Sequence, residues 1–162
     1  MDFWDGLGIA STVISIGGAF KSWKYYERSK DVTIYGNTKI ALVESEKIIT
    51  YLNEMLKLSN SRIMKKGVSI LFKQVCSYGE EIKKSLDEIR KVMPTKDFKE
   101  IEKLLDSQEI EIVKYVSTFI QGTIIVDEKL VIDDNFHLCM KKFSEMHTLI
   151  KEKLETQSEK LK

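Results

Sequence analysis

The sequence predicts an all-α protein, an antiparallel bundle of four to five helices that forms a single domain over residues 1–162. The chain has one proline and eight glycines, too little turn chemistry for the many short strands of a sandwich or barrel. Apolar residues recur at alternating steps of three and four along much of the chain, which places them on one helix face. A length of 162 residues suits one domain with one core.

Charge and composition point to a globular protein without a nucleic-acid partner. Lys and Arg number 26 and Asp and Glu 25, a formal net charge of +1, whereas nucleic-acid binders usually carry a large basic excess. Charged residues make up 31% of the chain and hydrophobic residues 43%. That mixture is typical of folded domains rather than disordered segments.

The first predicted helix covers residues 1–29, with Asp2 as its N-cap. Residues 6–20 carry no charge, but this run is shorter than the roughly 20 residues that a membrane-spanning helix needs. A secretory signal would begin with basic residues, whereas this chain begins with Asp2 and Asp5. Residues 30–36 are rich in β-branched side chains and end in Gly36, so we expect a loop there.

This first helix is apolar on two sides. One apolar stripe follows steps of four and three from Ile9 to Trp23, a second lies on nearly the opposite side, and small residues lie between them. A helix of this kind can pack closely against neighbours in water or in lipid. The residues that we expect to insert into a membrane or to dock onto a partner are Phe3, Trp4, Leu7, Ile9, Val13, Ile14, Ile16 and Phe20.

Residues 21–30 combine four cations, one anion and three aromatic rings. Basic and aromatic side chains both suit the headgroup region of a membrane. The residues that we expect to contact headgroups are Lys21, Trp23, Lys24, Tyr25, Arg28 and Lys30. Three interpretations of residues 1–30 stay open: a helix buried at the centre of the bundle with a solvated end, a permanent membrane anchor, and a helix that reaches a membrane only under some condition.

The second and third predicted helices, residues 37–60 and 61–93, each have one apolar face. The second helix carries Ala41, Ile48, Leu52 and Met55, with Ile49 and Leu56 alongside. The third carries a heptad seam of Met64, Val68, Leu71, Val75, Tyr78, Ile82 and Ile89, with Ser85 at the missing position. Because a heptad seam needs partner helices, this pattern predicts a bundle. Pro94 ends the third helix.

Residues 95–122 and 134–160 complete the predicted bundle. Asp106 with Glu109 resembles a capping box, so a break and restart at Asp106 is an alternative to one continuous helix. Residues 123–132 hold two β-branched triplets around a charged centre, which fits either a small β-hairpin or an ordered loop. The expected apolar faces are Phe98, Ile101, Leu105, Ile112, Val116 and Phe119, and then Phe136, Cys139 or Met140, Phe143, Met146, Ile150 and Leu154.

The sequence offers no constellation for catalysis, and we expect a protein that is not an enzyme and holds no metal or cofactor. No glycine-rich phosphate loop follows a strand pattern, and no nucleophile elbow is present. His137 and His147 are ten residues apart on one helix and point away from each other. Cys76 and Cys139 lie on apolar faces without a CxxC partner, which favours reduced core thiols in the cytosol.

The N-terminal stretch FWDGLGIASTVISIGGAFKSWKYYERSK resembles the opening of the cell-death four-helix bundles. These are the HeLo domain of fungal heterokaryon-incompatibility proteins, the executioner bundle of mixed-lineage-kinase-like pseudokinases, and their predicted bacterial relatives. The resemblance covers about 30 residues by pattern and the next 60 by architecture. It implies an effector that stores its N-terminal segment in a bundle and delivers it to a membrane on oligomerisation. This chain departs from the family in having no evident sensor or amyloid-like trigger segment, so the trigger would be a separate protein.

These observations give a leading functional hypothesis: a membrane-active bundle that permeabilises membranes through its N-terminal helix as a cell-death or defence effector. Its expected partners are membrane lipid, further copies of itself and a separate sensor or trigger protein. We expect it in the cytoplasm, moving to the inner face of the membrane on activation. The alternative is a soluble adaptor or regulatory bundle whose N-terminal helix is core or docks onto a partner protein.

Overall fold

In the part of the chain that it describes, the computed structural model shows four helices, which confirms the all-α prediction. It describes residues 3–59, 68–107, 110–111, 125–126, 129–130 and 134–162, with the backbone alone described for residues 3–20, 59, 68–69, 71–72 and the described part of 106–130. The helices are α1 (Phe3–Ser59), α2 (Val68–Val92), α3 (Thr95–Leu105) and α5 (Asp134–Leu161). Four two-residue strands, β1 (Asp106–Ser107), β2 (Ile110–Glu111), β3 (Ile125–Val126) and β4 (Lys129–Leu130), lie between α3 and α5.

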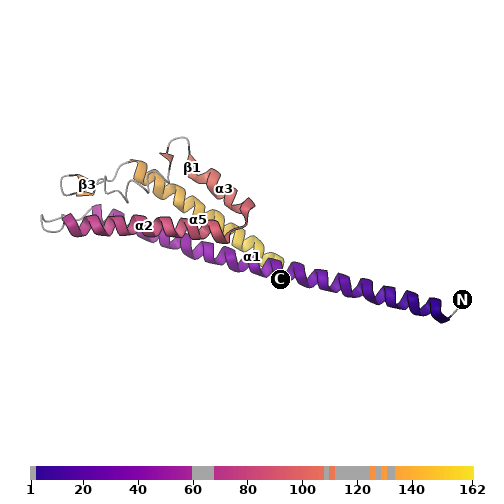
Figure 1. The fold of residues 1–162 in the computed structure, drawn as a ribbon. Helices are drawn as coiled ribbons and strands as arrows, with labels where there is room; N and C mark the ends of the chain where they lie inside the picture. Colours follow the sequence, from indigo (N-terminus) through magenta and orange to yellow (C-terminus); the bar gives the residue numbers. More distant parts are fainter. Residues whose placement is uncertain (1–2, 60–67, 108–109, 112–124, 127–128, 131–133) are drawn as a thin grey trace.

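Helix α1 packs antiparallel to both α2 and α5 (Figure 1). The rings of Tyr51 and Tyr78 lie 5.6 Å apart, and Ser85 Oγ of α2 donates a hydrogen bond to Glu44 Oε2 at 2.9 Å. Residue numbers therefore rise along α2 while they fall along α1. Helix α3 packs on α5, where Lys153 Nζ donates to Asp97 Oδ1 at 2.9 Å and to Glu100 Oε2 at 2.6 Å.

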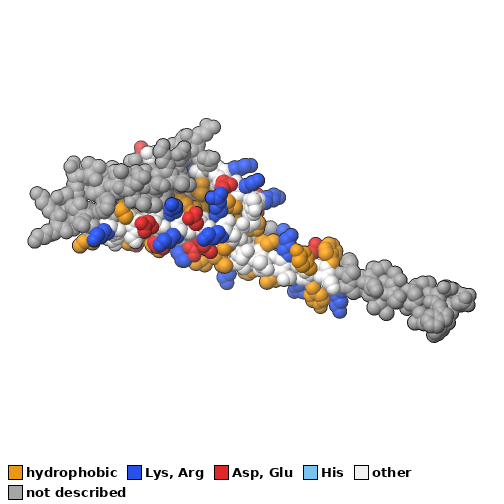
Figure 2. Space-filling view, viewed as in Figure 1, with side chains coloured by type: hydrophobic (Ala, Val, Ile, Leu, Met, Phe, Trp, Pro, Cys, Tyr) orange, Lys and Arg blue, Asp and Glu red, His pale blue; other side chains and the backbone are white. Residues whose placement is uncertain are grey.

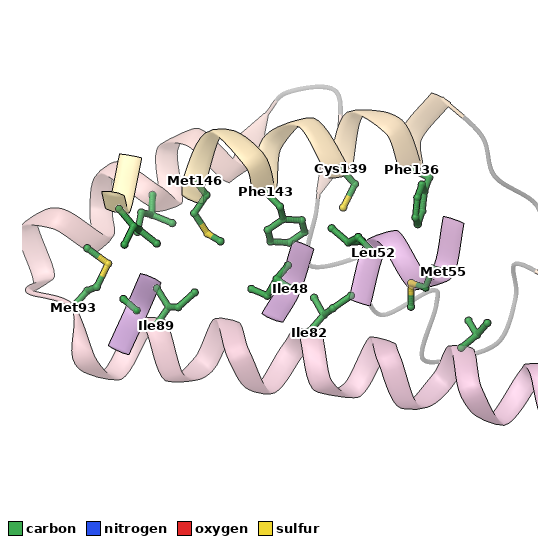
Figure 3. Packing of buried hydrophobic residues seen from close by; sticks show 14 residues of the cluster. Ile48, Leu52, Met55, Ile82, Ile89, Met93, Phe136, Cys139, Phe143 and Met146 are labelled. Carbon is green, nitrogen blue, oxygen red and sulfur yellow. The ribbon is translucent and has the colours of Figure 1, made fainter. Parts of the chain in front are cut away.

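The core consists of one heptad seam from each long helix, together with Met93 and Ile101. Figure 3 shows Phe143 of α5 and Ile48 of α1 pointing toward each other, with Ile82 of α2 beside them. The buried residues of the α1 seam are Thr38, Ala41, Ser45, Ile48, Leu52 and Met55, and those of α5 are Phe136, Cys139, Phe143, Met146 and Ile150. The predicted faces of these two helices are confirmed, with Cys139 rather than Met140 in the α5 seam.

The predicted heptad seam of α2 is confirmed wherever the structure describes its side chains. Val75, Ile82, Ser85 and Ile89 are buried and Tyr78 is half-buried. Met64, together with the rest of 61–67, lies outside the described residues, as do the side chains of Val68 and Leu71. On α3, Ile101 is buried, and Phe98 and Leu105 are half-buried against the same core.

The loop predicted at residues 30–36 is wrong, because α1 continues as a helix through this segment. Thr33 Oγ1 donates to the carbonyl of Ser29, and Thr38 Oγ1 to that of Ile34, each at 2.9 Å. β-Branched residues and glycine lower helix propensity by at most about 1 kcal/mol each. The seam that begins at Thr38 is buried, and packing of this kind overrides a small local preference.

Of the two alternatives for residues 95–122, the break at Asp106 is confirmed, because α3 ends at Leu105, and one continuous helix is wrong, because Asp106–Ser107 and Ile110–Glu111 are strands. β1 pairs antiparallel with β2, with Asp106 opposite Glu111 and Ser107 opposite Ile110. Asp and Ser side chains hydrogen-bond the nearby backbone and so disfavour a helix interior, which explains the end of α3. Residues 112–124 lie outside the described residues. Within 123–132 the hairpin alternative holds, because Ile125–Val126 pairs antiparallel with Lys129–Leu130.

Candidate functional site: the arm of α1

The candidate site lies on the N-terminal part of α1, which extends past the end of the bundle (Figure 1). At 57 residues, α1 is about 85 Å long. Every residue from 21 to 33 is exposed, residues 34 and 35 are half-buried, and Thr38 is the first buried residue of the seam. We call residues 3–33 the arm, and residues 21–30, which carry its basic and aromatic side chains, the collar.

The aromatic residues of the collar are far more exposed than aromatic residues usually are. The exposed fraction is 54% for Trp23, 67% for Tyr25 and 69% for Tyr26. Trp23 points along the same side of the helix as the buried seam of the bundle, whereas Tyr25 lies on nearly the opposite side, because each residue turns the helix by about 100°. Rings are therefore presented around the helix rather than on one stripe.

Three of the four collar cations share one side of the helix. Lys21, Lys24 and Arg28 follow steps of three and four, which places them on one face, and all three are exposed. Lys30 lies on another face near Trp23, and Glu27 is the one anion within the collar. Figure 2 shows hydrophobic and basic side chains next to each other on the described part of the arm. The collar thus offers a cationic face flanked by aromatic rings.

The structure brings all six residues expected to contact headgroups onto this exposed collar. The residues expected to insert are on the helical part of α1 that continues from the collar, away from the bundle, and their side chains lie outside the described residues: Phe3, Trp4, Leu7, Ile9, Val13, Ile14, Ile16 and Phe20. Within the described part of the chain, no helix is long and apolar enough to cross a membrane.

A second polar arrangement, which the sequence did not reveal, lies inside the bundle. Glu44 accepts hydrogen bonds from Lys47 Nζ at 2.6 Å and from Ser85 Oγ at 2.9 Å. Burial raises the pKa of the Glu44 carboxyl. The two hydrogen bonds and the charge of Lys47 together lower this pKa by more than burial raises it, so it lies below its ordinary value. The only sequence signal for this arrangement was Ser85 at an otherwise apolar seam position.

Ser45 of α1 forms a hydrogen bond that links α1 to α5. Its Oγ donates to the carbonyl of Leu42 at 2.7 Å and lies 2.9 Å from Nδ1 of His147. A hydroxyl has one proton, so with that proton on Leu42 the Oγ accepts from an Nδ1 that carries hydrogen. His147 is thus held as a hydrogen-bonding group between two helices. His137 is exposed, with its ring at the edge of Phe136, and the two histidines do not meet.

The described side chains do not form a recognisable catalytic or metal site. No group of three or more His, Cys, Asp or Glu residues in the described ranges is placed to hold a metal ion. Burial raises the pKa of the Cys139 thiol to about 12. Burial, with a smaller effect of the Glu80 charge, also raises the pKa of the half-buried Cys76. Both thiols therefore stay protonated at neutral pH, which makes them poor nucleophiles.

Comparisons with protein-family models, with curated proteins and with solved structures gave no match to this chain. Among the described residues, the exposed collar within the arm of α1 is the candidate functional site.

Proposed function

We propose that this protein is a membrane-active helical bundle, a cell-death or defence effector that permeabilises membranes through the N-terminal arm of α1. The observation that carries the proposal is the exposure of Trp23, Tyr25 and Tyr26 among basic residues on the part of α1 that extends past the end of the bundle. Exposed aromatic rings beside cations are poorly explained by contact with water alone, and they match the chemistry of a headgroup layer.

The two ends of the arm have different roles: its basic end contacts headgroups, and its uncharged end enters the bilayer. Lys21, Lys24 and Arg28 attract anionic headgroups, at about 1 kcal/mol for each cation near the surface. The uncharged residues 6–20 precede them and would span about 22 Å as a helix, less than the roughly 30 Å hydrocarbon core. One arm alone is therefore too short to cross an unperturbed bilayer and instead thins it locally. Leakage would require several arms together.

The proposal places the protein in the cytoplasm and its target at the inner, anionic face of the membrane. This arrangement agrees with cations at the end of the arm that joins the bundle, since basic residues stay on the cytoplasmic side. The resemblance to cell-death bundles supports the step from membrane contact to permeabilisation. A separate trigger protein would control when the arm is delivered.

The test is release of a trapped dye from vesicles that contain phosphatidylglycerol, with vesicles of phosphatidylcholine alone for comparison. Full-length protein is expected to release dye from the anionic vesicles, and a variant without residues 1–22 is expected to release none. A second variant, Trp23→Ser with Tyr25→Ser and Tyr26→Ser, should lose vesicle binding while keeping the thermal unfolding of the bundle. Its matched control is Ser77→Ala on the exposed side of α2, which should behave as the wild type.

Two results would contradict the proposal. One is full-length protein that neither binds nor permeabilises anionic vesicles at any ratio of protein to lipid, with or without oligomerisation forced by a fused dimerising domain. The other is a deletion of residues 1–22 that unfolds the bundle, because the arm would then be a structural part. Either result would favour a soluble adaptor or regulatory bundle whose N-terminal helix is core or docks onto a partner protein.

A further inference from the structure

The segment of α1 between the arm and the bundle is rich in residues that disfavour a helix. Residues 33–37 combine two β-branched side chains with an asparagine and with glycine, the least favourable helix residue after proline. A side chain added at Gly36 would meet no atom within 4 Å, so close packing does not explain the glycine. We call residues 33–37 the junction.

Hydrogen bonds from two threonines lie on either side of Gly36. Thr33 Oγ1 and Thr38 Oγ1 each donate to the backbone carbonyl four residues earlier, at 2.9 Å. A threonine that bonds the preceding turn in this way often bends its helix. Thr50 makes the same bond, but at a level where α2 and α5 both pack on α1. The two bonds at the junction therefore favour a bend wherever neighbouring helices do not oppose it.

The end of α2 falls beside the junction. Ser85 of α2 bonds Glu44 of α1, and because the two helices are antiparallel, each step along α2 corresponds to one step back along α1. This register places Val92, the last residue of α2, at the level of Asn37. On the N-terminal side of Asn37, α1 has therefore lost one of the two long helices that hold it in the bundle.

Helix α5 continues only slightly further along α1. The contact of His147 with Ser45, treated in the same way, places Leu161, the last residue of α5, at the level of Asp31. Residues 34–35 are half-buried, in keeping with a neighbour on one side, and Figure 1 shows α1 running on past both helices. Since packing supplies most of the stability of a helix in a protein, support for α1 decreases across a segment whose own sequence favours a helix weakly.

We propose that the junction is a hinge at which α1 bends, so that the arm changes direction relative to the bundle while both stay folded. A hinge consists of a few residues that absorb a change of backbone angles between two rigid parts. Here the rigid parts are the helical arm and the bundle, whose buried seam begins at Thr38. The open space beside Gly36 leaves room for the bend.

The hinge has a consequence for the way in which the arm meets a membrane. A stiff α1 that crosses a headgroup layer would hold the bundle in line with the arm, upright above the surface. With a bend at the junction, the collar stays among headgroups while the bundle turns toward the surface. This consequence rests on the proposed membrane activity, whereas the hinge itself does not.

The experiment measures the distance between two spin labels by double electron–electron resonance, in frozen buffer without lipid. One label is attached at Lys24→Cys on the arm and the other at Asp87→Cys, and both positions are exposed. The background is Cys76→Ser, which leaves the buried Cys139. Because the two labels lie on opposite sides of the junction and on different helices, a bend in either direction changes the distance between them.

The wild-type junction is expected to give a broad distribution of distances. Gly36→Ala should narrow it to about two thirds of the wild-type width or less, because alanine favours the helix more than glycine does, and Thr33→Gly should widen it for the opposite reason. The matched control is Ser29→Ala, an exposed position on the arm between the label and the junction, which should leave the width unchanged. Circular dichroism confirms that all variants keep their helices.

Two results would overturn the proposal. One is a wild-type distribution as narrow as that of Gly36→Ala, which would mean that α1 is stiff through the junction. The other is equal narrowing by Ser29→Ala, which would mean that the arm flexes along its length. Because the measurement needs no lipid, a protein that fails the vesicle test can still have the hinge, and a stiff α1 would leave the proposed membrane activity standing.

Discussion

At the scale of single residues, the bundle depends on polar groups that lie inside apolar seams. Ser45 and Ser85 are each buried, and each finds a partner on another helix, His147 and Glu44 respectively. Buried hydroxyl groups without partners would cost more than they contribute. These contacts link α1 to both of its neighbours at almost the same level of α1, one residue apart.

Ser85→Ala removes a donor to the partly buried carboxylate of Glu44, so we expect the free energy of unfolding at pH 7 to fall by about 1–2 kcal/mol. The pKa of Glu44 is lowered in the folded state, so its stabilising effect is present above the unfolded pKa and is lost as the pH falls through the folded pKa. The difference in the free energy of unfolding between the wild type and Ser85→Ala should therefore become smaller as the pH falls from 5 to 3.

Urea unfolding at pH 7 and at pH 3.5 measures this difference. The control is Ser77→Ala, which removes the same hydroxyl from an exposed position of α2 and should change the stability little at either pH. A difference in the free energy of unfolding between the wild type and Ser85→Ala that stays constant over this pH range would show that the hydrogen bond from Ser85 does not lower the pKa of Glu44.

Cys139 gives a second test at the residue scale, because its thiol is buried and its pKa is raised to about 12. The reactive thiolate is nearly absent from the folded protein at pH 8. We expect iodoacetamide to modify Cys139 only at the rate of unfolding, and Cys76, which is half-buried, appreciably faster. Mass spectrometry of the two peptides over time checks this order, and equal rates would place Cys139 outside the core.

At the scale of elements, the seams were predictable, as were the end of α2 before Pro94 and the start of α5 at Asp134, whereas the continuity of α1 was not. The apolar faces of α1, α2 and α5 follow heptad spacing, and because burial enforces that spacing, the sequence alone identified residues such as Ile48, Ile82 and Phe143. The continuity of α1 through residues 30–36 depends on packing of the following seam. It therefore opposed the local signals of β-branched residues and Gly36.

The collar shows the same limit at the candidate site. Its residue types could be chosen from the sequence, since Trp23, Tyr25 and the cations form a recognisable basic and aromatic segment. Whether that segment was buried or exposed could not be predicted, because a helix at the centre of a bundle is also apolar on all sides. The length of α2 and α5 decides the matter, since neither continues alongside residues 21–30 (Figure 1).

Gly36→Ala distinguishes a continuous α1 from the loop that the local sequence favours. Because the added Cβ meets open space, the substitution should raise helix stability by up to about 1 kcal/mol. A glycine needed for a turn would make the same substitution destabilising. Thermal unfolding followed by circular dichroism measures the sign of the change.

At the scale of the whole molecule, a nearly neutral chain conceals a strong separation of charge. The net charge is +1, and the described surface of the bundle carries many short ion pairs between residues three or four apart. The collar instead concentrates cations with one anion on a helix that extends from the bundle. An interaction with an anionic surface would therefore be directed through the arm rather than spread over the protein.

This separation predicts that position, and not total charge, controls binding to anionic vesicles. Lys21→Gln with Lys24→Gln and Arg28→Gln should weaken binding by roughly two orders of magnitude, at about 1 kcal/mol for each cation. Lys83→Gln with Lys103→Gln and Lys151→Gln removes as much charge from exposed positions of the bundle and should change binding less than threefold.

Sedimentation with phosphatidylglycerol vesicles at 0.05 M and 0.5 M salt measures the binding of both triple variants. Only proteins with an intact collar should show steep salt dependence, because exposed charges are screened within about 10 Å at 0.1 M salt. Equal losses in the two triple variants would mean that the whole surface, and not the arm, meets the membrane.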